Sequence, residues 1–181
     1  MFTAPTRAMN RQKEAAMCPE QNRDDVHGLP ATERVVLWAL RAWVVGQRKR
    51  MAVDALIAER LEWIGAENLA PLFDAFIGTV ALGAVRPLAI HCVCHRGLSE
   101  DERALLDALA LAQSGRGFET VLLLRCFLAP ASATEAVRFA CRIGEGLSQA
   151  GRVFDLRVLG STQYALAAED HRFGAVSLAI H

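Results

Sequence analysis

The chain has 181 residues, of which 52% are hydrophobic, and its 20 basic and 20 acidic side chains give a formal net charge of +0. A chain of this length can bury roughly 70% of its unfolded surface, which is enough for one ordinary domain with its own core. Because a neutral total charge exerts no general attraction on nucleic acid or an anionic membrane, we expect neither as a partner.

The sequence predicts neither a leader nor a membrane span. Its first residues are polar and lack the apolar run of a signal peptide, so we expect a cytoplasmic protein. The longest apolar stretch, residues 69–94, is interrupted by Asp74, Arg86 and Pro87, and a membrane helix needs about 20 consecutive apolar residues. The chain has five cysteines. An odd count in a protein that is not exported predicts free thiols rather than a disulfide framework.

Residues 1–29 are predicted to be a disordered tail, because polar residues dominate them and bury too little apolar area to offset the entropy of ordering. Residues 30–181 are predicted to form a single globular domain. Its first part is expected to hold three helices, over residues 31–47, 51–63 and 67–82, where apolar side chains recur at helical spacing. Gly83 and the pair Arg86-Pro87 are expected to end the third helix.

Two capping patterns predict where later helices begin. In the segment Ser99-Glu100-Asp101-Glu102, the serine oxygen can accept a hydrogen bond from the amide of Glu102, whose carboxylate can reach back. A helix is therefore expected from this segment to about Gln113. A similar segment, Ser132-Ala133-Thr134-Glu135, predicts a helix over residues 134–149.

Residues 118–128 fit either a buried strand or a helix, and we favour a helix because a proline and the second capping pattern follow directly. In the segments 88–94, 153–159 and 175–180, side chains alternate with a period of two residues, which is typical of strands. The predicted fold is therefore mainly α, with a minor β element near the carboxyl terminus. If 88–94 and 118–128 were both strands, residues 87–159 would instead form a β-α-β-α-β unit of an α/β fold, with its ligand site near Cys94.

The segment His91-Cys92-Val93-Cys94-His95 is the candidate site. Thiolate and imidazole are the ligands that zinc prefers, so these four side chains are a candidate metal site, with zinc or iron as the ion. In an extended chain Cys92 and Cys94 point to one side and both histidines to the other, so His95 joins the thiols only through a bend. The usual second ligand pair is absent, and a dimer could supply it.

Three other interpretations of this segment stay open. A thiol near a protonated histidine and a helix start can take part in redox chemistry, although a disulfide between cysteines one residue apart is strained. The interpretation that we favour is that the cysteines are the inward face of a strand, because cysteine packs as a small apolar residue. A nucleophilic enzyme would combine Cys94 with His95 and Glu100 or Asp101, although the chain contains no complete catalytic or cofactor motif.

Two further groups of side chains have simpler interpretations. Arg41 and residues 47–50 form a basic patch that is predicted to be a solvated helix end, where cations suit the helix dipole. The three tryptophans, Trp38, Trp43 and Trp63, are predicted to anchor the core.

The stretch from Arg86 through His91 and His95 to Leu106 resembles small uncharacterised helical proteins of bacteria, over about residues 30–150. This resemblance implies a helical fold and no activity. The sequence favours a non-enzymatic protein that acts through a protein partner or through self-association as a homo-oligomer. The alternatives are a metal-binding or thiol-based protein that uses residues 91–95, and a small α/β enzyme with its site near Cys94.

Overall fold

The computed structural model describes residues 25–155, and these form a helical domain. Its α-helices are α1 (Ala31–Lys49), α2 (Asp54–Glu62), α3 (Ala70–Gly83), α4 (Glu100–Gln113), α5 (Gly117–Arg125) and α6 (Pro130–Gln149). Single turns of 3₁₀ helix, η1 (Val26–Gly28) and η2 (Glu67–Leu69), precede α1 and α3. The described residues contain two isolated β-bridges, Asp25 with Gly97 and Ala84 with Leu128, and no strand. The prediction of a mainly α fold is confirmed.

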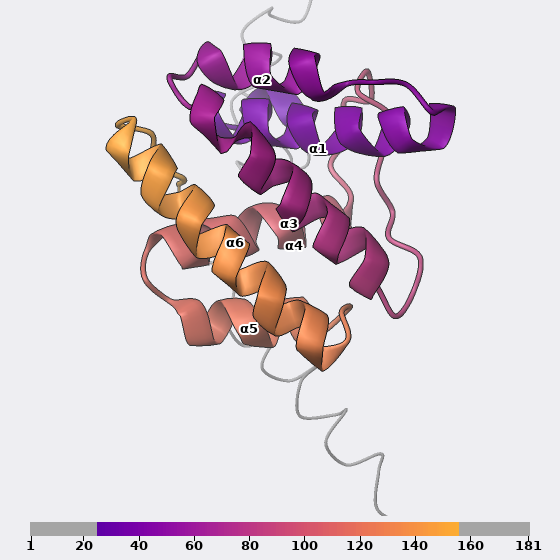
Figure 1. Cartoon of the computed structure of the whole chain (residues 1–181), viewed down its shortest axis with the longest axis vertical. Coiled ribbons are helices and arrows are strands. Elements are labelled where there is room, and N and C mark those ends of the chain that lie inside the picture. The colour runs from indigo at the N-terminus through magenta and orange to yellow at the C-terminus, as the bar shows by residue number, and fades with distance from the viewer. Residues whose placement is uncertain (1–24, 156–181) are drawn as a thin grey trace, which may run out of the picture.

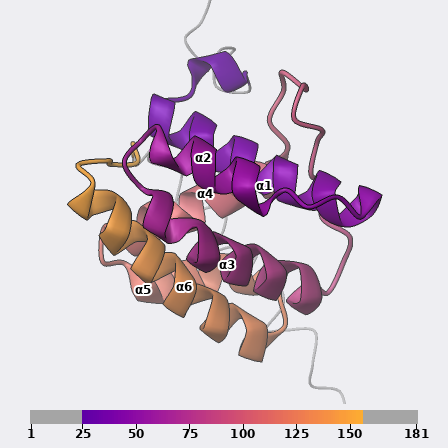
Figure 2. The same ribbon diagram turned by 45° about the horizontal axis from the view of Figure 1, so that its top comes forward.

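Helices α3 and α4 lie in the middle of the domain, where they contact α1 on one side and α6 on the other. Helix α6 lies against α3, α4 and α5, whereas α1 and α2 pack on each other at the opposite end of the domain (Figures 1 and 2). The core between them is built from large apolar side chains such as Phe73, Phe76, Leu105, Leu124 and Ile143, each at most 2% exposed. None of the helices within residues 25–155 is both long and apolar enough to cross a membrane.

Small residues on α6 bring it close to α4. Ala133, Ala136 and Ala140 are fully buried on its inner face. A Cβ atom at Gly144 would lie 2.7 Å from Cα of Gln113 on α4, so only a glycine permits this approach. The Gln113 side chain then donates to the carbonyl of Gly144 over 3.3 Å.

The two capping predictions have different outcomes. Ser99 caps α4 as predicted: its Oγ accepts from the amide of Glu102, and the Glu102 carboxylate accepts from the amide of Ser99. The second prediction is wrong, because α6 begins at Pro130 and not at Thr134. Proline has the φ angle of a helix and needs no partner for its nitrogen, which suits the first helical position. Ser132 therefore lies within α6, beside Gly83.

The α/β alternative for residues 87–159 is wrong. The segment 118–128 contains helix α5, as we favoured, and residues 88–94 form no strand. The amides of Ala89 and His91 donate to carboxylates of α4 instead of to a neighbouring strand. In the segment 153–159, residues 153–155 are not a strand; the rest of it, and the segment 175–180, lie outside the described residues.

The start of the described chain is packed. Leu29 is 4% exposed and belongs to the core, and the remainder of the predicted tail, residues 1–24, lies outside the described residues. Trp38 and Trp43 pack against the core as predicted, but Trp63 is 66% exposed.

Candidate functional site

The residues that the sequence singled out lie on the α3–α4 loop, residues 84–99, which runs alongside α1 (Figures 1 and 2). The loop is held by a buried ion pair. Arg41 of α1 donates from Nε to Oε1 of Glu102 over 2.7 Å and from Nη2 to Oε2 over 2.8 Å. Their side chains are 2% and 0% exposed. Two parallel bonds between a guanidinium and a carboxylate fix the position of both groups.

Arg41 also binds the second half of the loop, which leads from His95 to Ser99. Its Nη1 donates to the carbonyl of His95 over 2.6 Å, and its Nη2 donates to the carbonyl of Gly97 over 2.7 Å. Burial of a charged pair costs several kcal/mol per ion unless hydrogen bonds replace the lost water. Here the carbonyls of the loop accept those bonds, so the loop must keep its shape for the buried Arg41 guanidinium to keep its hydrogen bonds.

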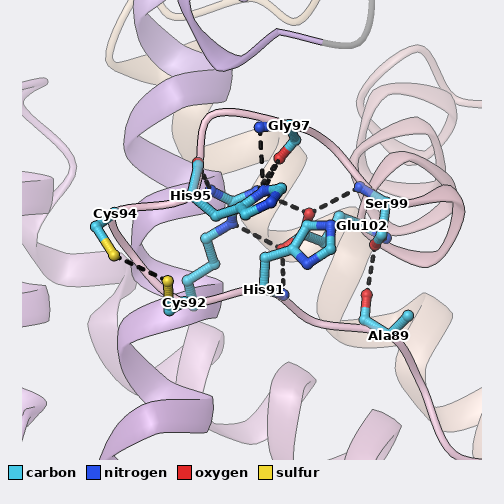
Figure 3. Close-up of polar contacts among 9 residues, drawn as sticks. Ala89, His91, Cys92, Cys94, His95, Gly97, Ser99 and Glu102 are labelled. Atoms are coloured by element: carbon cyan, nitrogen blue, oxygen red, sulfur yellow. Dashed lines mark hydrogen bonds and ion pairs between the residues drawn. The ribbon is translucent and has the colours of Figure 1, made fainter.

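Glu102 accepts hydrogen bonds from both halves of the loop, one before the thiol pair and one after it. The amides of His91 and Ser99 donate to its carboxylate over 2.9 and 3.0 Å (Figure 3). Ser99 Oγ donates in turn to the carbonyl of Ala89. Burial raises the pKa of the Glu102 carboxyl, but the bonds from Arg41, Ser99 and His91 outweigh burial, and the pKa lies below its ordinary value.

Asp101 fixes the beginning of the loop in the same way. Arg86 donates to its two carboxylate oxygens over 2.6 and 3.0 Å, and the amide of Ala89 donates over 2.7 Å. The bond from Arg86 lowers the pKa of the Asp101 carboxyl, and it raises the pKa of Arg86. The first turn of α4 is therefore a rigid base for the whole α3–α4 loop.

Cys92 and Cys94 form an exposed thiol pair at the tip of this loop. Their Sγ atoms lie 2.9 Å apart. A tight turn brings them together, because the amide of His95 donates to the carbonyl of Cys92 over 3.0 Å. The hydrogen bond from the Cys94 thiol lowers the pKa of the Cys92 thiol, and the same bond raises the pKa of Cys94.

His91 and His95 form a separate imidazole pair. Their ring centroids are 4.0 Å apart, and the amide of Gly97 donates to His95 Nδ1 over 3.1 Å. Figure 3 shows the rings on the side of the loop that faces Glu102, while the sulfur atoms point to the other side. The loop therefore presents two pairs of ligands and not one group of four.

This arrangement bears directly on the metal hypothesis. Within residues 25–155, no group of three or more histidine, cysteine or acidic side chains is placed to hold one ion. Zinc–sulfur bonds of about 2.3 Å at tetrahedral angles would set two sulfur atoms about 3.8 Å apart. The thiol pair would have to open by nearly 1 Å from its 2.9 Å separation to bind zinc in this way.

The other candidate groups are already engaged or buried. The Asp101 carboxylate is occupied by Arg86 and the amide of Ala89, so it is not free to orient His95 in a nucleophilic site. Cys126 and Cys141 are partly buried, and burial raises the pKa of both thiols.

The central residue of the site, Arg41, was not found from the sequence. We predicted a solvated helix end around it, yet it is 1% exposed. One signal was present: Arg41 follows Leu37 by four residues, on the apolar face of α1. An arginine on that face needs a buried acceptor, and only the fold shows that this acceptor is Glu102.

Comparisons of the chain with protein families, with curated proteins and with solved structures found no match. The resemblance to small helical proteins of bacteria stays a prediction, and the function is argued from the geometry of the α3–α4 loop.

Proposed function

We propose that this protein is a thiol–disulfide exchange module in which Cys92 and Cys94 alternate between a dithiol and a disulfide. The observation that carries the proposal is the 2.9 Å separation of two exposed sulfur atoms. A disulfide bond is about 2.05 Å long, so closure needs only a small movement at the loop tip. The bonds from Arg41 and Glu102 to both halves of the loop keep the thiols adjacent in the reduced state.

The small loop that this disulfide would close favours a reversible role. In the chain-entropy relation, a bridge across three residues stabilises the fold by about 1.6 kcal/mol, against about 3 kcal/mol for a loop of 15 residues. Because the fold gains little from the bridge, oxidation and reduction can proceed without loss of the domain.

The exchange follows from the two thiols. Cys92, as a thiolate, attacks one sulfur of a small disulfide R–S–S–R, which forms a mixed disulfide and releases RS⁻. Cys94 then attacks Cys92 Sγ and releases the second RS⁻. The protons of the two cysteines pass through solvent to the departing thiolates, which gives one protein disulfide and two RSH. The lowered pKa of Cys92 supports its role as the first nucleophile, because the thiolate is the reactive form.

The test is equilibration of the full chain with mixtures of reduced and oxidised glutathione, followed by acid quenching and mass spectrometry of peptides. We expect a Cys92–Cys94 bridge that dithiothreitol removes, and its loss in Cys92→Ser and in Cys94→Ser. Cys141→Ser, which removes a partly buried thiol on α6, is the matched control and should still form the bridge. A thiol pair that stays reduced in fully oxidised glutathione would overturn the proposal.

A protein partner or self-association, which the sequence favoured, stays a second candidate. The observation in its favour is an apolar groove of about 520 Å³ between α1, α3 and the start of the α3–α4 loop, where Val85 is 66% exposed. Sedimentation equilibrium of the full chain is the test. A molecular mass that rises with concentration would support self-association, and a constant monomer mass would contradict it.

A further inference from the structure

A second groove, of about 320 Å³, reaches the tip of the α3–α4 loop at Val93. It is formed by η1, the first half of α1, Arg60 of α2 and the loop tip. Val93, the residue between the two cysteines, forms part of its wall. A small molecule in this groove would therefore contact the residue between the two cysteines, although neither cysteine lines the groove itself.

All the charged side chains that line this groove are basic. Three arginines, Arg34, Arg41 and Arg60, line it, and no acidic residue does. Arg41 is already paired with Glu102. Within residues 25–155, neither Arg34 nor Arg60 forms an ion pair, so both guanidinium groups are free to bind an anion.

An aromatic surface holds one of these arginines in place. The Arg60 guanidinium lies 4.8 Å from the ring centroid of Trp38 and 4.4 Å from that of Trp63. Contact with two indole rings orients a guanidinium without using its hydrogen-bond donors. Those donors can therefore meet a carboxylate in the planar, two-bonded manner that arginine favours.

We infer that this groove selects low-molecular-weight disulfides that carry carboxylate groups, which it binds through Arg34 and Arg60 beside Cys92 and Cys94. The inference rests on the proposed function and names its substrate class. Bound carboxylates would place the central sulfur atoms of the ligand near the loop tip. Cys92 then attacks the bound disulfide, Cys94 resolves the mixed disulfide, and each R–S⁻ leaves as a carboxylated thiolate. Electrostatic attraction in a groove raises association rates about tenfold or more, and salt weakens it.

The experiment compares three disulfides of similar size: dithiodipropionate, which is anionic, bis(2-hydroxyethyl) disulfide, which is neutral, and cystamine, which is cationic. The rate of Cys92–Cys94 bridge formation is measured for the full chain and for a free Cys-Val-Cys peptide, which has the thiols without the groove. We expect the anionic-to-neutral rate ratio to be about tenfold higher in the protein than in the peptide, and to fall as salt is added.

Variants separate the groove from the general fold. Arg34→Gln and Arg60→Gln should each lower the rate with dithiodipropionate about threefold or more, while the rate with the neutral disulfide stays unchanged and so reports an intact loop. Arg60→Lys, which keeps the charge, should retain part of the preference. The matched control is Arg125→Gln, at an exposed position on α5 at the other end of the domain, and it should change neither rate.

The outcomes distinguish the two proposals. If the bridge forms with all three disulfides in the same rate ratios as in the peptide, the groove does not select its ligand and this inference is wrong, while the proposed exchange stands. If no reagent forms the bridge, the proposed function fails and the inference fails with it.

Discussion

Arg41 and Glu102, 61 residues apart in the chain, form a buried ion pair with two hydrogen bonds of 2.7 and 2.8 Å. The pair joins α1 to the first turn of α4. Each partner also binds backbone groups of the α3–α4 loop, so the pair sets the shape of the loop that carries the thiols.

Removal of one partner should therefore destabilise the whole domain. Arg41→Met leaves the Glu102 carboxylate buried without its cation, and we expect a loss of about 3–5 kcal/mol in the free energy of unfolding. Urea denaturation followed by circular dichroism measures it. The control is Arg138→Met, which breaks the exposed pair with Glu135 and should change stability by less than about 1 kcal/mol. Equal effects of the two variants would contradict the role of the buried pair.

The two serines of the capping patterns should respond differently to substitution. Ser99→Ala removes the acceptor of the Glu102 amide and should cost about 1–2 kcal/mol. Ser132→Ala should change stability by less than about 0.5 kcal/mol, because Ser132 lies within α6 and does not cap it. Thermal unfolding of both variants is the measurement, and a large loss for Ser132→Ala would mean that Ser132 caps α6 after all.

Two helical glycines provide a similar comparison. Gly144→Ala would place a Cβ 2.7 Å from the backbone of Gln113, and we expect a loss of about 1–3 kcal/mol from overpacking. At Gly78 the nearest atom to an added Cβ is 3.9 Å away. Gly78→Ala should therefore be neutral or stabilise the protein by up to about 1 kcal/mol, because alanine favours a helix. Similar effects at both positions would contradict the close packing of α4 and α6.

Asp101 should make stability depend on pH. Hydrogen bonds from Arg86 hold the folded pKa of its carboxyl below the ordinary value of 3.8. As the pH falls, the Asp101 carboxylate is therefore protonated at a higher pH in the unfolded state than in the folded state. The contribution of Asp101 is fully present above the ordinary pKa and is lost as the pH falls through the lower folded pKa. Asp101→Asn should cost about 1 kcal/mol at pH 6, since Arg86 is half exposed.

The measurement for Asp101 is urea denaturation of both proteins between pH 6 and pH 2.5, within the range where each still folds. The difference between them should stay constant above about pH 5 and shrink below about pH 4. A difference that grows on acidification would show that the pKa is shifted in the opposite direction.

The zinc hypothesis makes a prediction of its own. Each chain offers two sulfur atoms on one side of the loop, so a site with four thiolates needs two chains. We expect zinc-bound protein to contain one ion for every two chains and to sediment as a dimer. Elemental analysis of reduced protein, with a Cys92→Ser/Cys94→Ser variant beside it, measures this. Metal-free protein prepared without chelator would contradict zinc binding.

The sequence by itself determined most of the local structure. Apolar spacing located α1, α2 and α3, because a helix repeats every 3.6 residues and its buried face follows from that period. The Ser99 capping box located the start of α4, because both of its bonds lie within four residues. The alternation of side chains also predicted thiols on one side of residues 91–95 and imidazoles on the other, which the loop shows, although Cys92 to His95 form a tight turn and not an extended chain.

The tertiary structure alone decided what these pieces do together. Residues 88–94 alternate like a strand, but their amides find carboxylates of α4, and no neighbouring strand is present within residues 25–155. Arg41 seemed a solvated cation until the fold placed Glu102 and two loop carbonyls around it. Such partners lie more than 50 residues away in the chain, and local patterns carry no information about which distant groups a buried charge will meet.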